Sequence, residues 1–163
     1  PAFFKSSGPF RGHKRALYEG GIRTPLIARW PGRIKAGTRA DQVCAFWDFL
    51  PTCCDLAGID PPSDIDGLSI LPTLMGRPAQ QKQHAYLYWE FHEEGKKQTV
   101  RRGDWKGVRV TVAKNPDGPI ELYDLKTDPG EQTDVSAAHR DIVAEIALIM
   151  KTARTPSTAW PLP

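Results

Sequence analysis

The spacing of hydrophobic residues changes near residue 80. After that point apolar and polar residues alternate, which is the period of a strand with one buried face. The alternation predicts four strands, at residues 85–91, 98–102, 105–112 and 120–123. Turn-forming residues rich in glycine, aspartate and asparagine separate the four segments. Because short turns of this kind join antiparallel neighbours, we expect one small antiparallel sheet.

A helical pattern follows the predicted sheet. Apolar residues recur every three or four positions, at Ile142, Val143, Ile146, Ile149 and Met150. This spacing places them on one face of a helix, so we expect the helix to cover one face of the sheet. Ser136 or Asp134 is expected to cap its first turn.

The first half of the chain predicts one strand and one shorter helix. Residues 24–30 are a short, mainly apolar run, and we expect a strand there. A helix that begins at Asp48 and ends before Gly58 puts Pro51 in the first turn, where a proline costs no hydrogen bond. The Asp48 carboxylate would then accept hydrogen bonds from the first N–H groups. The alternative is one kinked helix from residue 41.

The boundary between the two halves is predicted at Arg77-Pro78 and the glutamine-rich residues 80–83. We therefore assign residues 1–78 to one domain and residues 79–163 to a second, and the fold class to α+β.

Composition and charge limit the classes of partner. With 40% hydrophobic and 25% charged residues the chain is typical of a globular protein, and its apolar runs are too short to span a membrane. The net charge of +3 hides an asymmetry, because residues 1–40 hold nine Lys or Arg against Glu19 alone. Such a basic end can attract a polyanion, either a sulfated glycan or, less favoured here, a nucleic acid. A solvated cationic surface explains the same charge.

Cysteines and acidic residues predict neither disulfides nor a metal site. The three cysteines are an odd number and Cys53 and Cys54 are adjacent, so we interpret them as small buried side chains. Asp60, Asp64 and Asp66 alternate in a predicted loop. The glycine and distal glutamate of a calcium-binding EF-hand loop do not follow at the required spacing.

The segment from Gly12 to Pro25 is the stretch best suited to an anion. Lysine and arginine side chains surround the Gly20-Gly21 pair, and glycine lets backbone approach a ligand or another segment closely. This segment resembles the sulfatase family, in which a lysine stands four residues before a Tyr-Glu-Gly-Gly-hydrophobic-Arg-x-Pro run. Here Lys14 precedes Tyr18–Pro25 in that way. Later family landmarks follow in order at residues 48–52, 56–59, 66–69, 121–125 and 128–131.

The resemblance implies what the chain does and what it lacks. Sulfatases carry upstream a Cys-x-Pro/Ser-x-Arg signature, whose cysteine or serine becomes formylglycine, and aspartates that bind calcium. Neither signature occurs in this sequence. The resemblance therefore implies the C-terminal part of an exported sulfatase: the end of a larger α/β domain followed by the C-terminal sheet and helix. Its partner would be the upstream part of the same enzyme, and alone it would be inactive.

The resemblance also implies roles for individual residues. Lys14 would contact the sulfate group, and His13 beside it is a second candidate. The C-terminal sheet of sulfatases often borders the substrate pocket, so His92, Gln98 and Arg101 are candidates to contact the sugar or aryl part. We interpret Glu19 and Arg23 as an ion pair that holds the turn.

Alternative functions and one further partner stay open. A phosphodiesterase or phosphonate hydrolase of the same superfamily would share the anion-binding segment. A non-catalytic module could bind sulfated glycans through residues 1–40 alone. An apolar strand at residues 24–30 without a neighbour would favour a homodimer, through its exposed edge or by swapping.

Overall fold

The computed structural model describes residues 3–162, which fall into two compact units. One unit combines the N-terminal residues up to Thr24 with those from Tyr86 onward, and the other comprises Pro25–Ala85. The N-terminal segment thus packs with the predicted sheet, far away in sequence. The prediction that residues 1–78 and 79–163 belong to separate domains of a longer protein stays a prediction.

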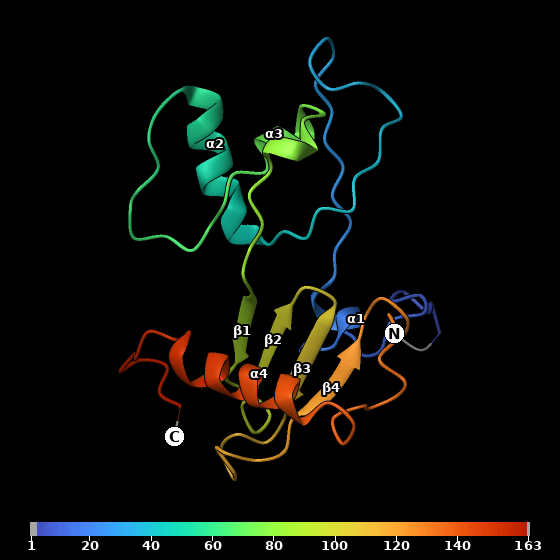
Figure 1. The fold of residues 1–163 in the computed structure, drawn as a ribbon, viewed down its shortest axis with the longest axis vertical. Coiled ribbons are helices and arrows are strands. Elements are labelled where there is room, and N and C mark those ends of the chain that lie inside the picture. The colour runs from blue at the N-terminus through green and yellow to red at the C-terminus, as the bar shows by residue number, and fades with distance from the viewer. Residues whose placement is uncertain (1–2, 163) are drawn as a thin grey trace. The chain divides into compact units, whose positions relative to one another are not determined.

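The first unit contains one antiparallel sheet in the order β1-β2-β3-β4 (Figure 1). Its strands are β1 (Leu87–Phe91), β2 (Lys97–Arg102), β3 (Trp105–Arg109) and β4 (Glu121–Asp124). All four predicted strands are confirmed. β3 ends before its predicted end at residue 112, because Thr111 has a positive φ of 60° and begins a turn in which its carbonyl accepts from the N–H of Lys114.

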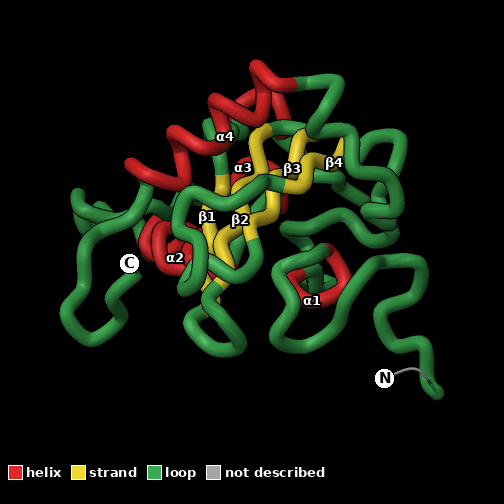
Figure 2. Tube along the Cα trace, turned by 90° about the horizontal axis from the view of Figure 1, so that it is seen from below, coloured by secondary structure: helices red, strands yellow, loops and turns green. Residues whose placement is uncertain are grey.

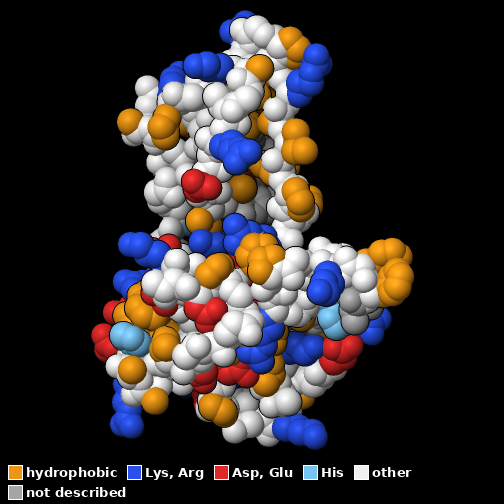
Figure 3. Space-filling view, turned by 90° about the vertical axis from the view of Figure 1, so that its right-hand side faces the viewer, with side chains coloured by type: hydrophobic (Ala, Val, Ile, Leu, Met, Phe, Trp, Pro, Cys, Tyr) orange, Lys and Arg blue, Asp and Glu red, His pale blue; other side chains and the backbone are white. Residues whose placement is uncertain are grey.

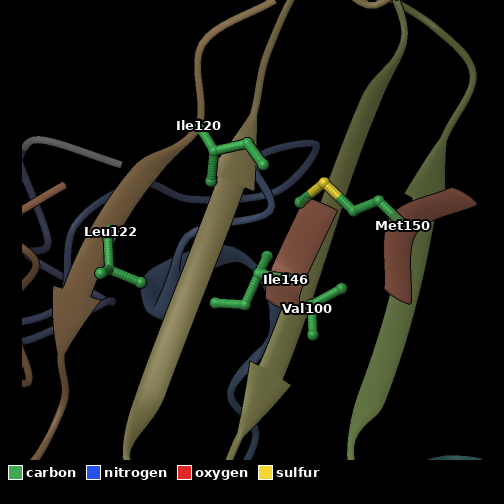
Figure 4. Packing of buried hydrophobic residues seen from close by; sticks show 5 residues of the cluster. All are labelled: Val100, Ile120, Leu122, Ile146 and Met150. Atoms are coloured by element: carbon green, nitrogen blue, oxygen red, sulfur yellow. The ribbon is translucent and has the colours of Figure 1, made fainter. Parts of the chain in front are cut away.

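Helix α4 (Arg140–Thr152) lies across one face of this sheet and packs on β2 and β3 (Figure 1). The predicted apolar stripe is confirmed. The buried core comprises Val100, Ile120, Leu122, Ile146 and Met150 (Figure 4). Gly107 allows this packing, since a Cβ there would lie 2.6 Å from Cγ2 of Ile146.

The predicted cap of this helix is wrong. The helix begins at Arg140, and its N-cap residue His139 makes no side-chain capping hydrogen bond. Oδ1 of Asp134 instead accepts from the backbone N–H groups of Leu122, at 3.0 Å, and Ser136, at 2.9 Å. Asp134 therefore ties a turn to β4, a long-range contact that competes with capping.

The opposite face of the sheet is covered by the N-terminal segment with the short helix α1 (Glu19–Ile22) (Figure 2). Val108, Tyr123 and Leu125 are buried there, with Tyr18 packed against them. The sheet is thus covered on both faces.

The second unit consists mainly of loops around short helices. These are η1 (Phe46–Asp48), α2 (Phe49–Ala57), α3 (Leu71–Leu74) and η2 (Pro78–Gln80). The strand predicted at residues 24–30 is wrong: these residues are all exposed, and no described strand pairs with them. Lys and Arg side chains lie on the surface of this unit (Figure 3), and its cations at residues 29–39 are all exposed.

The helix predicted from Asp48 to Gly58 is confirmed as α2, with Gly58 at its C-cap and a φ of 70°. The predicted cap role of Asp48 is wrong, because its carboxylate makes no cap hydrogen bond to α2. Its oxygens accept from the N–H groups of Ala45 (2.7 Å) and Leu68 (2.8 Å), and Nε2 of His84 lies 2.9 Å away. Asp48 is fully buried and joins three segments of this unit.

The cysteines differ in burial. Cys54 is buried as predicted and Cys44 is half-buried. The prediction is wrong for Cys53, which is exposed. Within residues 3–162 there is no helix with the length and apolar character needed to cross a membrane.

Candidate functional site

Lys14 lies in a tight turn of the first unit. The carbonyl of His13 accepts a hydrogen bond from the N–H of Ala16 at 2.8 Å, and Arg15, the third residue, has a φ of 78°. A positive φ at this position is the mark of a type II turn. Lys14 occupies the second position, and its side chain is exposed, as is that of His13.

The Gly20-Gly21 pair supports this turn through close backbone contact. The N–H of Gly20 donates to the carbonyl of Arg11 at 2.7 Å. A Cβ on Gly20 would lie 2.4 Å from the carbonyl oxygen of Gly12, and one on Gly21 would lie 2.1 Å from that of Ala16. No side chain fits at either position, so the turn rests directly on α1.

The hairpin that connects β1 and β2 contacts the same turn through charged side chains. Arg15 pairs with Glu93 at 3.4 Å and with Glu94 at 3.5 Å. Nζ of Lys97 donates to the carbonyl of Arg15 at 3.2 Å and to Oε2 of Glu94 at 2.8 Å. Lys14, in contrast, makes no side-chain hydrogen bond or ion pair with any residue in the described range 3–162, so its ammonium is free to meet an anion.

A buried ion cluster lies under α1. Nζ of Lys106, on β3, is 2.9 Å from Oε1 of Glu19 and 3.0 Å from Oε1 of Glu131. The exposed fractions of Lys106, Glu19 and Glu131 are 0%, 3% and 0%. The other oxygen of Glu131 accepts from the N–H of Glu19 at 2.6 Å. Burial raises the pKa of Glu131, and the attraction of Lys106 only partly offsets that effect.

Two arginines approach the remaining oxygen of Glu19. Nη1 of Arg23 lies 3.6 Å from Oε2 of Glu19, which confirms the predicted ion pair between them. Nη1 of Arg101 lies 3.9 Å from the same oxygen. These arginines balance the excess negative charge of two carboxylates around one lysine.

A second polar cluster joins the segment to β4. Tyr18 and Tyr123 both donate their hydroxyl hydrogens to Oε2 of Glu121, and Arg11 donates to the hydroxyl of Tyr123 at 2.6 Å. The Arg11 guanidinium also lies over the Tyr18 ring, 3.9 Å from its centroid. Burial and the Glu121 carboxylate raise the pKa of both tyrosines, so both hydroxyls stay protonated as donors.

The structure does not gather all predicted site residues in one place. Gln98 and Arg101 lie on β2 but face opposite sides of the sheet. Gln98 is 4% exposed, and its amide donates to the hydroxyl of Tyr88 at 2.8 Å and to the carbonyl of Met150 at 3.3 Å, beside α4. Arg101 lies near Glu19, on the side of the Lys14 turn.

His92 belongs to the cluster that surrounds Glu90. Its Nε2 lies 2.9 Å from Oε2 of Glu90, whose other oxygen accepts from Nε of Arg154 at 2.8 Å. The ring of His92 contacts that of Trp160, with centroids 5.6 Å apart. Of the candidates, Lys14, His13 and Arg101 therefore share the α1 side of the sheet. Gln98 lies on the α4 side, and His92 contacts Glu90, which accepts a hydrogen bond from the same Tyr88 hydroxyl that binds Gln98.

Sequence reasoning missed the buried contact between Lys106 and Glu131, although Glu131 ends the family landmark at residues 128–131. A lysine inside a strand is usually exposed, so the pattern gave it no role. One signal was present: Trp105 and Val108 stand on opposite faces of the same strand, which indicates a strand covered on both sides. A lysine in such a strand requires a buried acidic partner.

Comparison with known proteins identifies the family. Residues 10–155 match the family described as N-sulphoglucosamine sulphohydrolase, C-terminal. The chain belongs to the sulfatase C-terminal family. An N-acetylglucosamine-6-O-sulfatase of Bacteroides thetaiotaomicron is 36% identical over 75% of this sulfatase chain and 23% of the relative. The human N-acetylgalactosamine-6-sulfatase is 34% identical over 82% of the chain and 30% of the relative. The chain thus spans about a quarter to a third of the length of these relatives.

Solved structures have the same fold. A protein in complex with its substrate D-glucosamine-2-N,6-O-disulfate has a TM-score of 0.60 and 28% identity, over 77% of this sulfatase chain and 26% of that protein. The crystal structure of Ps i-CgsB has a TM-score of 0.76 over 90% of the chain and 32% of that protein, and at 24% identity it shows the fold alone. The same limit applies to a phosphonate monoester hydrolase from Silicibacter pomeroyi, with a TM-score of 0.56 and 24% identity over 77% of the chain and 28% of that protein. These matches confirm the α+β fold class.

Proposed function

We propose that this chain is the C-terminal part of a sulfatase that hydrolyses sulfate esters, and that Lys14 is its contribution to the reaction. The observation that carries the proposal is the Lys14 turn. It lies within the matched family region, its backbone is fixed by Gly20 and Gly21, and the lysine ammonium has no partner among residues 3–162. The neighbouring cation Arg15, in contrast, is paired.

Lys14 would act by electrostatic stabilisation. When the ester bond breaks, negative charge grows on the leaving oxygen and is shared by the oxygens of the sulfate. An ammonium group held within hydrogen-bond reach of these oxygens lowers the energy of that charge. Because the turn is already formed, little reorganisation is needed during the reaction.

The family implies two further catalytic groups, formylglycine and calcium, and this chain supplies the residues for neither. No three His, Cys, Asp or Glu residues of the described range come together as ligands for a metal ion. Neither calcium nor formylglycine fits the residues present, so no reaction step is assigned to either group here. Under the proposal both belong to the upstream part of the enzyme, and the chain alone releases no sulfate.

The proposed substrate class is a sulfated sugar. The two relatives above are named as 6-sulfatases of N-acetylated hexosamines, and one structural neighbour holds a disulfated glucosamine. His13, His92 and Arg101 stay candidates to contact the sugar. Gln98 is a weaker candidate, because reaching a ligand would require the loss of its buried hydrogen bonds. Export from the cytoplasm, usual for sulfatases that act on glycans, is part of the proposal.

The proposed protein partner is the upstream part of the enzyme. Ile27 and Phe46, both in the second unit, support a contact with this upstream part, because 91% and 76% of their surface is exposed. A second copy of the chain is the alternative partner for these exposed side chains.

The substrate class is tested by comparing hydrolysis rates of different esters by the longer protein, in which the proposed upstream part precedes this chain. Sulfate release from a 6-sulfated N-acetylhexosamine should exceed phosphonate monoester hydrolysis under the same conditions. The reverse order would favour the phosphonate hydrolase alternative, which rests on a shared fold. Salt-sensitive heparin binding by the isolated chain, without activity in the longer protein, would favour a glycan-binding module.

A further inference from the structure

Glu131 connects the sheet to the segment that carries Lys14, although it lies more than a hundred residues away in sequence. One of its oxygens lies 3.0 Å from Nζ of Lys106, and the other accepts from the N–H of Glu19 at 2.6 Å. Lys106 in turn lies 2.9 Å from the side chain of Glu19. The first residue of α1 is therefore held twice, through its backbone and through its side chain.

The contacts continue from α1 to the Lys14 turn. The residue after Glu19 is Gly20, whose N–H donates to the carbonyl of Arg11 at 2.7 Å. Gly21 then lies against the carbonyl of Ala16, the last residue of the turn. If the first residue of α1 moved, the turn would have to move with it. The contacts between their backbones are so close that they leave no space for a side chain.

Stability alone does not explain this buried cluster. Two carboxylates share one lysine, and burial disfavours their charged forms. Oε1 of Glu131 receives no hydrogen bond of good geometry, although Lys106 is close. Apolar side chains of similar volume often stabilise a fold as well as a buried ion pair does. What an apolar side chain cannot supply is an acceptor aimed at the N–H of Glu19.

We propose that Glu131 is a positioning residue for Lys14. Oriented by Lys106, its carboxylate fixes the first residue of α1, and α1 fixes the turn that presents the Lys14 ammonium. This inference deepens the proposed function and rests on it. Glu131 itself is buried and contacts no substrate.

The test compares two variants of Glu131 in the longer protein. Glu131→Leu removes the acceptor and leaves a neutral Lys106–Glu19 pair in the interior. Glu131→Gln keeps an acceptor oxygen of the same reach. Since misplacement of a reacting group by about 1 Å can cost on the order of 100-fold in rate, Glu131→Leu should lower kcat/KM for sulfate release by roughly 10- to 100-fold. Glu131→Gln should retain most of the activity.

A double-mutant cycle separates positioning from general stability. In a Lys14→Ala background, Glu131→Leu should lower kcat/KM by less than about twofold, because the group it positions is already absent. Glu145→Gln, at an exposed ion pair of α4 with Arg102, is the matched control and should leave kcat/KM unchanged. If Glu131→Leu does not fold, Glu131→Asp, which is too short to reach the N–H of Glu19, takes its place in the cycle.

The outcomes are distinct. Wild-type activity of Glu131→Leu, or an equal loss in the presence and absence of Lys14, would overturn the positioning role. Equal losses in the Leu and Gln variants would also overturn it, because the acceptor would then be irrelevant. Full activity of Lys14→Ala alone would instead refute the proposed role of Lys14, and the positioning role would fall with it.

Discussion

Adding a single methyl group at Gly21 should move the Lys14 turn. A Cβ at this position would lie 2.1 Å from the carbonyl oxygen of Ala16 and 2.8 Å from that of His13. Real Cβ contacts are almost never shorter than 3.0 Å, so the turn must move by about 0.9 Å. Both obstructing atoms belong to the backbone and cannot rotate away. Overpacking of this kind costs about 1–3 kcal/mol, whereas alanine gains about 1 kcal/mol over glycine in a helix.

We therefore predict that Gly21→Ala loses up to about 2 kcal/mol of unfolding free energy and roughly 100-fold in kcat/KM for sulfate release by the longer protein. The assay pairs chemical denaturation with initial rates. Gly103→Ala is the control, because Gly103 has a φ of 60° and open space where the methyl group would stand, with no contact within 4 Å. It should lose similar stability through backbone strain but keep its activity. Full activity of Gly21→Ala would refute the claim that the glycine pair fixes the turn.

Two further predictions concern the sheet unit. Ile146→Ala removes a fully buried side chain between α4 and the sheet, and should destabilise the protein by about 2–5 kcal/mol in urea denaturation; a loss below about 1 kcal/mol would contradict the packing described. Burial raises the folded-state pKa of Glu131, so the stability it contributes is complete below its ordinary value of 4.5 and is lost as pH rises through the folded value. The stability advantage of Glu131 over Glu131→Gln should therefore shrink as pH rises from 4.5, and an advantage that grows with pH would contradict this sign.

The local elements could be predicted from the sequence because their signals are local. The alternation at residues 85–123 predicts the strands, since only a period of two keeps one side of each strand buried. The stripe that includes Ile146 and Met150 predicts α4 and the face it buries. Gly58 ends α2 as expected, because a left-handed residue closes the helix.

The long-range polar contacts could not be predicted in the same way. Asp48 is at the position expected for a helix cap, yet it holds Leu68 and His84 instead. Asp134 binds β4 rather than the first turn of α4. In each case a short polar side chain had a local partner and a distant one, and only the three-dimensional fold decides between them.

The candidate site was predicted in part. The Gly20-Gly21 pair indicated close backbone contact in this segment, and the structure contains it. The turn itself was expected at residues 18–23, where the structure has helix α1, and it lies instead at residues 13–16. The strand expected at residues 24–30 needs a neighbouring strand to pair with, and no described segment supplies one. The apolar run alone was therefore not enough to predict a strand. The burial of Lys106 was not predicted, because a charged residue in a strand is normally exposed. Its acidic partners lie on α1 and in a turn far away in sequence.

The most direct test of the central claim is the rate of sulfate release by the longer protein with Lys14→Ala. Lys114→Ala, at another exposed lysine of the same unit, is the matched control. Removal of one group that stabilises developing charge typically costs about 100- to 1,000-fold, so kcat should fall by that amount in Lys14→Ala alone. Equal activity of the two variants would contradict the account, because Lys14 would then be one more surface lysine.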